Sequence, residues 1–189
     1  KLSNKVESMQ FSPIRRFNPI AQKAKDAGKK VYHLNIGQPD VESTECFMEA
    51  IRGYEPKVIA YAESQGLPVL QDAVIEYFKN YDMDVERGDM IITTGGSEAL
   101  TMIFTALLNE GDEVLLAEPF YTNYNTFAKA AGGKVVPITT SAEDGYHYAK
   151  REQIVPLITE KTKAICCINP GNPTGTVLTM EEMQLIADI

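Results

Sequence analysis

The chain has 189 residues, of which 44% are hydrophobic and 23% are charged, and this balance is ordinary for a globular protein with a sizeable core. The net charge of −8 and a pI of about 4.8, with basic residues scattered among the acids, argue against nucleic acid as a partner. No apolar run approaches the roughly 18 residues of a membrane-spanning helix, and the N-terminus does not resemble a signal peptide. We therefore expect no membrane partner and a cytoplasmic location.

The chain has three cysteines, which are Cys46, Cys166 and Cys167. Their number is odd and they show no paired CxxC spacing, so the pattern favours core packing over a disulfide or a metal site. We accordingly expect no metal ligands.

The N-terminal part of the chain predicts one helix and one short strand. The helix is expected to have Asn18 as its cap, a proline at its first position and Gly28 at its end. The strand is expected over residues 31–36 and leads into the loop that contains Gly37.

Two further helices are predicted before residue 80. Ser43 or Thr44 can cap the first, which reaches about Gly53. The second follows Gly66, and its apolar residues recur at helical spacing, which favours packing of one face against a core. These residues are Leu67, Leu70, Val74, Tyr77 and Phe78.

From residue 90 onward, strands and helices alternate. Strands are expected over 90–94, 113–117, 134–138 and 163–168, with helices after Gly96, before Gly132 and near 151–158. We expect Pro156 to weaken the last of these helices, because proline lacks an N–H group. The alternation predicts an α/β fold with a mostly parallel sheet and helices on both faces.

The most informative loop of the chain contains Asn172. It follows the apolar strand predicted over 163–168 and precedes a helix at Thr179, where Thr179 and Glu182 have the spacing of a capping box. Two prolines fix φ and two glycines free it, so the loop presents the Asn172 amide at the carboxyl edge of the sheet. An amide there can orient a ligand oxygen. The alternative is an Asx-turn that only connects strand and helix.

Two other loops are expected at the same edge. Gly96, Ser97 and Glu98 open a helix whose free N–H groups favour an anion such as phosphate, although a plain serine-capped helix would look the same. Tyr121 follows the next strand and could stack on a flat ligand. Together with Asn172, these loops suit a phosphorylated aromatic cofactor.

Six motifs occur in order along nearly the whole chain. They are Leu34-Asn35-Ile36-Gly37-Gln38-Pro39-Asp40, Tyr61 with Gly66-Leu67, Gly95-Gly96-Ser97-Glu98-Ala99-Leu100, Gly111-Asp112-Glu113-Val114, Pro119-Phe120-Tyr121 and Asn172-Pro173-Thr174-Gly175. This series resembles class I/II aminotransferases of fold type I, which depend on pyridoxal 5'-phosphate. The resemblance implies that residues 1–40 form an N-terminal arm and part of a small domain. Residues 41–189 would be the N-terminal portion of the large cofactor-binding domain.

The resemblance also implies a role for each site residue. The amides of Gly96, Ser97 and Glu98 would bind the cofactor phosphate, and Tyr121 would stack on the pyridine ring. In the same way, Asn172 would bond the phenolic oxygen of the ring, Gly37 would line the substrate carboxylate, and Tyr61 would reach the phosphate of a partner subunit. The implied protein is a homodimer of amino acid metabolism that transfers an amino group between an amino acid and a 2-oxo acid.

No lysine of this chain matches the position of the family's Schiff-base lysine. The chain starts without Met and stops inside a predicted helix, so we expect a part of a longer protein that is inactive alone. Alternatives from the same fold are a carbon–sulfur lyase, an aminocyclopropane-carboxylate synthase-like protein, or a sensing module of a transcription regulator. A nucleotide-binding α/β domain is a more distant alternative, because the chain lacks a phosphate-loop lysine.

Overall fold

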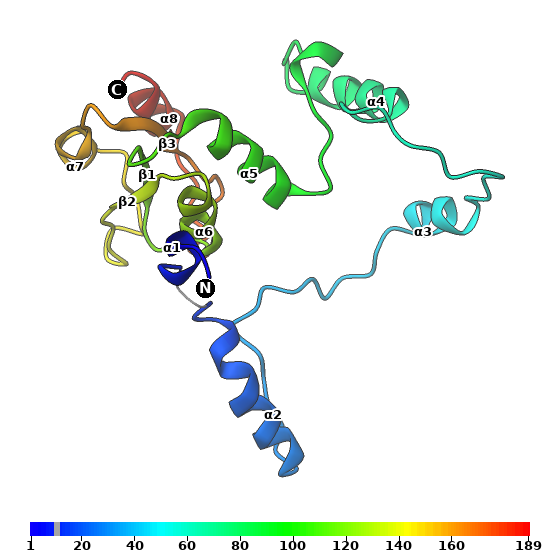
Figure 1. Cartoon of the computed structure of the whole chain (residues 1–189), viewed down its shortest axis with the longest axis horizontal. Helices are drawn as coiled ribbons and strands as arrows, with labels where there is room; N and C mark the ends of the chain where they lie inside the picture. The colour runs from blue at the N-terminus through cyan, green and yellow to red at the C-terminus, as the bar shows by residue number, and fades with distance from the viewer. Residues whose placement is uncertain (10–11) are drawn as a thin grey trace. The chain divides into compact units, whose positions relative to one another are not determined.

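The computed structural model describes residues 1–9 and 12–189 (Figure 1). The chain divides into two compact units by the contacts within it. The first unit comprises Lys1–Val31 and Ser97–Ile189, and the second comprises Tyr32–Gly96. The expected domain boundary near residue 40 stays a prediction.

A three-stranded parallel sheet forms the centre of the first unit. Strand β1 (Glu113–Ala117) lies between β2 (Lys134–Ile138) and β3 (Thr162–Cys166), and it is parallel to both. In the register, Val114 lies opposite Val135 on one side and Ala164 on the other. The predicted parallel α/β arrangement is confirmed, and each predicted strand of this unit forms within two residues of its expected bounds.

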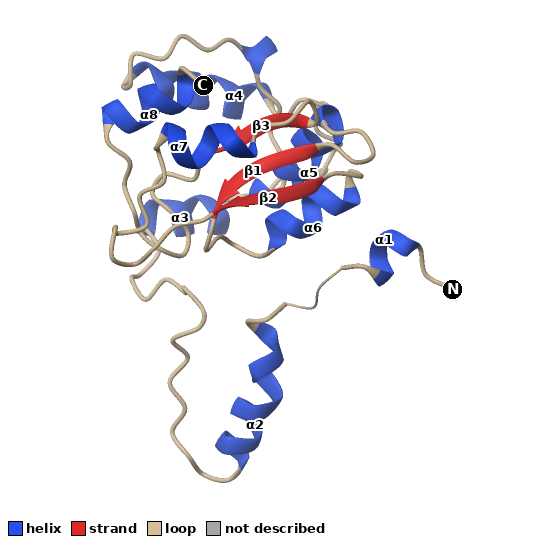
Figure 2. Cartoon of the chain, turned by 90° about the vertical axis from the view of Figure 1, so that its left-hand side faces the viewer, coloured by secondary structure: helices blue, strands red, loops and turns tan. Residues whose placement is uncertain are grey.

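Helices α7 (Arg151–Ile154) and α8 (Met180–Ala187) cover one face of this sheet (Figure 2). Leu115 and Ile138 are buried there against Ile154, and apolar residues of α8 pack around them. This cluster anchors both helices to the central strand.

Helices α5 (Gly96–Leu107) and α6 (Asn123–Ala130) cover the other face. Val114 points into that face and packs against Phe104 of α5 and Ala128 of α6. Because both faces of β1 are covered, its residues form the continuous apolar run that the sequence shows.

Two local expectations for the first unit are confirmed. The Thr179 hydroxyl accepts a hydrogen bond from the Glu182 N–H at 3.2 Å, and the Thr179 N–H donates to Glu182 Oε2 at 2.8 Å, which completes the capping box. At Pro156 the α7 helix gives way to a 3-10 turn, Val155–Leu157, as expected where an N–H group is missing.

The remaining helices of this unit lie near the N-terminus, and one expectation there is wrong. They are α1 (Asn4–Glu7), a 3-10 turn (Arg15–Phe17) and α2 (Asn18–Asp26). Asn18 is the first helical residue and not the cap, because the preceding 3-10 turn already places it in the helical region with φ −55° and ψ −45°. The expected end at Gly28 is confirmed, since that residue adopts a φ of 77°.

The second unit contains α3 (Glu45–Arg52), α4 (Pro68–Lys79) and a 3-10 turn (Arg87–Asp89). Both α-helices were expected, and Thr44 is the N-cap of α3. Within this unit, the Arg87 guanidinium donates to Asp72 Oδ1 at 2.7 Å and joins the turn to α4.

Two expected strands do not form. Residues 31–36 contain a turn and a bend, and residues 90–94 are irregular. A strand needs a neighbouring backbone to complete its hydrogen bonds, and the three described strands pair only with one another. Apolar sequence alone is therefore insufficient in these two segments.

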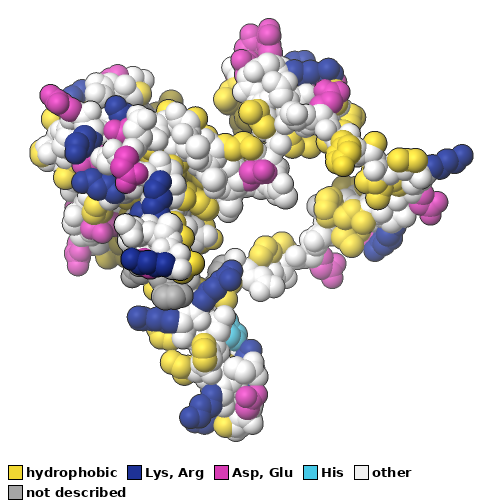
Figure 3. Space-filling view, in the orientation of Figure 1, with side chains coloured by type: hydrophobic (Ala, Val, Ile, Leu, Met, Phe, Trp, Pro, Cys, Tyr) yellow, Lys and Arg dark blue, Asp and Glu magenta, His cyan; other side chains and the backbone are white. Residues whose placement is uncertain are grey.

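The expected core packing is wrong for Cys46 on α3, which is exposed, and for most of the α4 stripe. Leu67, Leu70 and Tyr77 are exposed, whereas Val74 and Phe78 are half-buried. Figure 3 shows apolar side chains at the surface over α3 and α4. Both buried apolar clusters of the described residues belong to the first unit, and neither includes a residue of α3 or α4.

Among the described residues, none of the helices combines the length and the apolar character needed to cross a membrane.

Candidate functional site

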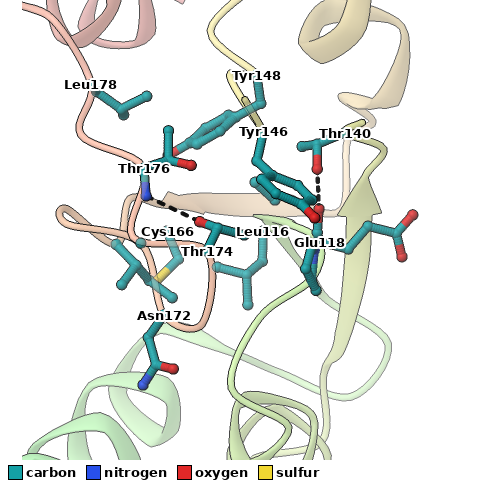
Figure 4. Close-up of a pocket in the computed structure, with 14 residues that line it drawn as sticks. Leu116, Glu118, Thr140, Tyr146, Tyr148, Cys166, Asn172, Thr174, Thr176 and Leu178 are labelled. Atoms are coloured by element: carbon teal, nitrogen blue, oxygen red, sulfur yellow. Dashed lines mark hydrogen bonds between the residues drawn. The ribbon is translucent and has the colours of Figure 1, made fainter. Parts of the chain in front are cut away.

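Two of the predicted site loops meet at the carboxyl edge of the sheet. Because β1 and β3 are parallel neighbours, the loops after Ala117 and after Cys166 leave the sheet on the same side. Parts of both loops line one pocket that is open to solvent, shown in Figure 4, whereas Tyr121 is not among its lining residues. Its lining from these loops includes Glu118, Pro119, Gly171 and Asn172.

The loop around Asn172 is held by its own backbone. The Gly171 N–H donates to the Thr176 carbonyl at 2.8 Å, and the Gly175 N–H donates to the Gly171 carbonyl at 2.8 Å. Gly175 adopts a φ of 74°, a conformation that side chains rarely allow. The Asn172 side chain is exposed at the rim, where its amide can donate to a ligand oxygen.

Tyr121 lies at the start of the segment that leads into α6. The Asn123 side-chain amide donates to the Tyr121 hydroxyl at 2.6 Å, and the Tyr124 ring meets the Tyr121 ring edge-on at a centroid distance of 6.5 Å. Tyr124 in turn lies 6.5 Å from Phe104 of α5. The Tyr121 ring is therefore oriented by two contacts while remaining 37% exposed, as a stacking residue must be.

The start of α5 offers open backbone. Ser97 and Glu98 are exposed in its first turn, and the Ser97 carbonyl accepts a hydrogen bond from the Thr101 hydroxyl at 2.7 Å. A side chain added at Gly95 or Gly96 would meet nothing within 4 Å. An anion can therefore approach the N–H groups of this twelve-residue helix, although Glu98 adds a negative charge at the same place.

The other two predicted residues belong to the second unit. Gly37 is exposed, and a side chain added there would meet nothing within 4 Å. Tyr61 is fully exposed, so its side chain does not pack against its own unit. A role for Tyr61 toward a partner subunit and a role for Gly37 toward a substrate remain predictions.

Tyr146 and Tyr148 line the pocket and were missed by the sequence reasoning. Tyr148 is only 5% exposed, and its hydroxyl has no hydrogen-bond partner among the described residues. Burial raises the pKa of Tyr148, and the neighbouring Cys167 thiol raises it further. The sequence could have predicted their position, because the segment 139–148 follows the predicted strand over 134–138. In a parallel sheet this segment leaves at the same edge as the other two loops.

Two titratable groups near the site, the Cys166 thiol and the Tyr124 hydroxyl, have raised pKa values. Burial raises the pKa of Cys166 to about 11, and burial also raises the pKa of Tyr124. A buried thiol of this kind is a poor nucleophile. The raised pKa of Cys166 favours a packing role for this residue.

Known proteins resemble this chain over its whole length. The family model described as aminotransferase class I and II matches residues 29–189. An aspartate aminotransferase of Bacillus sp. (strain YM-2) is 35% identical over 190 residues, which cover 100% of this chain and 48% of that relative.

Solved structures show the same likeness. A single mutant of the Thermus thermophilus aspartate aminotransferase is similar with a TM-score of 0.90 and 32% identity, over 100% of this chain and 50% of the other. An alanine aminotransferase from Pyrococcus furiosus is similar with a TM-score of 0.89 and 34% identity, over 100% and 49%. The chain thus spans about half the length of the relatives that it matches.

Proposed function

The chain belongs to the aminotransferase class I and II family, and from this premise we propose that it supplies the cofactor-binding edge of a pyridoxal-phosphate-dependent aminotransferase. The proposed reaction transfers an amino group between an amino acid and a 2-oxo acid. The proposed protein is a cytoplasmic homodimer.

One observation carries this proposal beyond family membership. Asn172 and Tyr121 lie in the loops that follow the adjacent parallel strands β3 and β1, so both loops are at the same edge of the sheet. The Asn172 amide is exposed, and the Tyr121 ring is 37% exposed. The first turn of α5 adds backbone N–H groups that an anion can approach, because no atom crowds Gly96. A hydrogen-bond donor, an aromatic face and a set of N–H groups are the parts that a phosphorylated pyridine ring requires.

The residues present fit this cofactor, and each has a distinct task. The Ser97 and Glu98 N–H groups would hold the phosphate, because the helix terminus favours negative charge. Tyr121 would pack against the ring face and Asn172 would donate to the ring oxygen. When bound, the cofactor supplies an electron sink for the carbon that loses its proton, and the protein's part is to hold the ring in place.

The lysine that the family requires is proposed to lie outside this chain. The support for this is the resemblance, in which no lysine of this sequence matches the position of the Schiff-base lysine. The 189-residue chain alone would therefore contact the phosphate and the ring of the cofactor but would not turn over a substrate.

Equilibrium binding of pyridoxal phosphate tests the proposal. In the natural full-length protein, meaning the natural polypeptide that contains this chain, Asn172→Ala should weaken cofactor binding. Asn80→Ala is the matched control, since it removes an amide that only bonds carbonyl groups at the end of α4. Equal cofactor affinity in both variants would remove Asn172 from the site.

A further inference from the structure

A hydrogen-bonded turn lies beside the Asn172 loop. Gly145 and Tyr146 both adopt left-handed backbone conformations, with φ values of 60° and 63°. The Tyr146 N–H donates to the Ser141 carbonyl at 2.9 Å, and the Gly145 N–H donates to the Ala142 carbonyl at 3.1 Å. Such a conformation is costly for a bulky residue like tyrosine and persists where the surroundings fix it. We name residues 141–147 the bracing turn.

Thr176 connects the bracing turn to the Asn172 loop. Its hydroxyl donates to the Gly145 carbonyl at 2.8 Å, and its own carbonyl accepts the Gly171 N–H at 2.8 Å. The Thr176 N–H also donates to the Thr174 hydroxyl at 3.3 Å, as Figure 4 shows. Thr176 therefore closes the loop that carries Asn172 through its bond to Gly171, and it also joins this loop to the bracing turn.

A second contact fixes the far end of the same segment. His147 of the bracing turn lies with Nδ1 2.8 Å from Glu182 Oε1. The other oxygen of Glu182 accepts the Thr179 N–H at the start of α8. The segment between Gly171 and Thr179 is thus tied to the bracing turn directly through Thr176, and at its C-terminal end through Glu182.

Thr176 and Asn172 face different surroundings. In Figure 4 the Thr176 and Thr174 side chains lie on the side of Tyr146 and Tyr148, whereas the Asn172 amide points away from them. A ligand atom bonded by the Asn172 amide would therefore not meet the Thr176 hydroxyl. Any effect of Thr176 on that ligand must act through the loop.

We propose that Thr176 is a positioning residue for Asn172, and that its hydroxyl bond to Gly145 sets where the Asn172 amide meets the ring oxygen of the cofactor. The inference rests on the proposed function. Removal of the hydroxyl leaves the loop closed by its backbone bonds and leaves the His147–Glu182 contact in place, but it breaks the direct bond between the loop and the bracing turn. A displaced donor then makes a longer and weaker hydrogen bond.

Two substitutions separate the hydroxyl from the methyl group of Thr176 in the natural full-length protein. Thr176→Val removes the donor and should weaken pyridoxal phosphate binding by roughly 2- to 10-fold, the factor typical of one neutral hydrogen bond. Thr176→Ser keeps the donor and should stay within about 2-fold of the unmodified protein. Equal affinities in the two variants would overturn the proposal. If Thr176→Val does not fold, Thr176→Ala takes its place.

A double-mutant cycle separates positioning from a general loss of stability. In an Asn172→Ala background, Thr176→Val should change cofactor affinity by less than about 2-fold, because the residue through which it acts is gone. Independent effects that multiply across the cycle would contradict the assignment.

Amide hydrogen exchange supplies a readout without cofactor. The Gly171 N–H should exchange faster in Thr176→Val than in Thr176→Ser at equal unfolding free energy, since the carbonyl that it bonds belongs to residue 176. Equal exchange would count against the brace. If the unmodified protein binds no pyridoxal phosphate, the proposed function fails, whereas normal binding that Asn172→Ala weakens and Thr176→Val does not would refute this inference alone.

Discussion

The side-chain amide of Asn123 donates to the hydroxyl of Tyr121 at 2.6 Å, so a residue of the first turn of α6 orients the aromatic ring at the site. Asn123→Ala should let that ring rotate and should weaken pyridoxal phosphate binding in the natural full-length protein by roughly 2- to 10-fold. Asn125→Ala on the same helix is the control. Titration of both variants with pyridoxal phosphate measures the difference. Equal affinities for the two variants would show that the Asn123 hydrogen bond is not needed to orient the Tyr121 ring.

The glycine at the start of α5 should matter more than the serine beside it. Gly96→Val places a branched side chain where the backbone is now open, whereas Ser97→Ala removes only one hydroxyl. Because an anion bonds the N–H groups themselves, the first change should weaken phosphate or cofactor binding more than the second. Titration with inorganic phosphate and with pyridoxal phosphate measures both. The reverse order would place the phosphate elsewhere.

Tyr61→Phe tests the proposed contact across the dimer. Tyr61 is fully exposed in its own unit, so loss of its hydroxyl should leave the fold intact. Cofactor binding should weaken by about 1.5–3 kcal/mol, the range for one hydrogen bond to a charged group. Tyr54→Phe, at another exposed tyrosine of this unit, is the control. Unchanged cofactor affinity for Tyr61→Phe would exclude this residue from the site.

Acid should destabilise the fold through Glu113. The Thr159 hydroxyl donates to its carboxylate at 2.7 Å and Lys134 lies 3.0 Å away, and these contacts lower the pKa of Glu113 below its ordinary value of 4.5. The stabilisation is present above that ordinary value and is lost as the pH falls through the lowered pKa, since the unfolded chain takes up the proton first.

Urea unfolding of Glu113→Gln from pH 7 to pH 3 measures this contribution. The variant should be less stable at pH 7 and should lose less stability on acidification than the unmodified chain. Glu152→Gln changes an exposed glutamate and serves as the control. Parallel pH curves for Glu113→Gln and the unmodified chain would assign the acid sensitivity to other groups.

Local sequence signals predicted the elements whose causes are local. The box of Thr179 and Glu182 is complete, and the strands at 113–117 and 134–138 form with the expected bounds. The segments 31–36 and 90–94 have comparable apolar character but no strand partner among the described residues, and pairing is a long-range property.

The same distinction applies to the site. Asn172 and Tyr121 were predictable, because each follows an apolar strand and the parallel topology brings their loops together. The bracing turn was not predictable, because it depends on the left-handed conformation of Tyr146. A tyrosine rarely adopts that conformation, so its presence in the sequence does not predict it. Its link to Thr176 spans 31 residues and appears only in the folded chain.

Transfer of isotopic nitrogen tests the central claim most directly. The natural full-length protein, supplied with pyridoxal phosphate, a ¹⁵N-labelled amino acid such as aspartate or alanine, and an unlabelled 2-oxo acid, should pass the label to the oxo acid. The 189-residue chain alone should not. Asn172→Ala should slow the transfer, and omission of pyridoxal phosphate from cofactor-free protein should abolish it. Release of labelled ammonia with no label in the acceptor, for every amino acid tested, would contradict the account and indicate a lyase of the same fold.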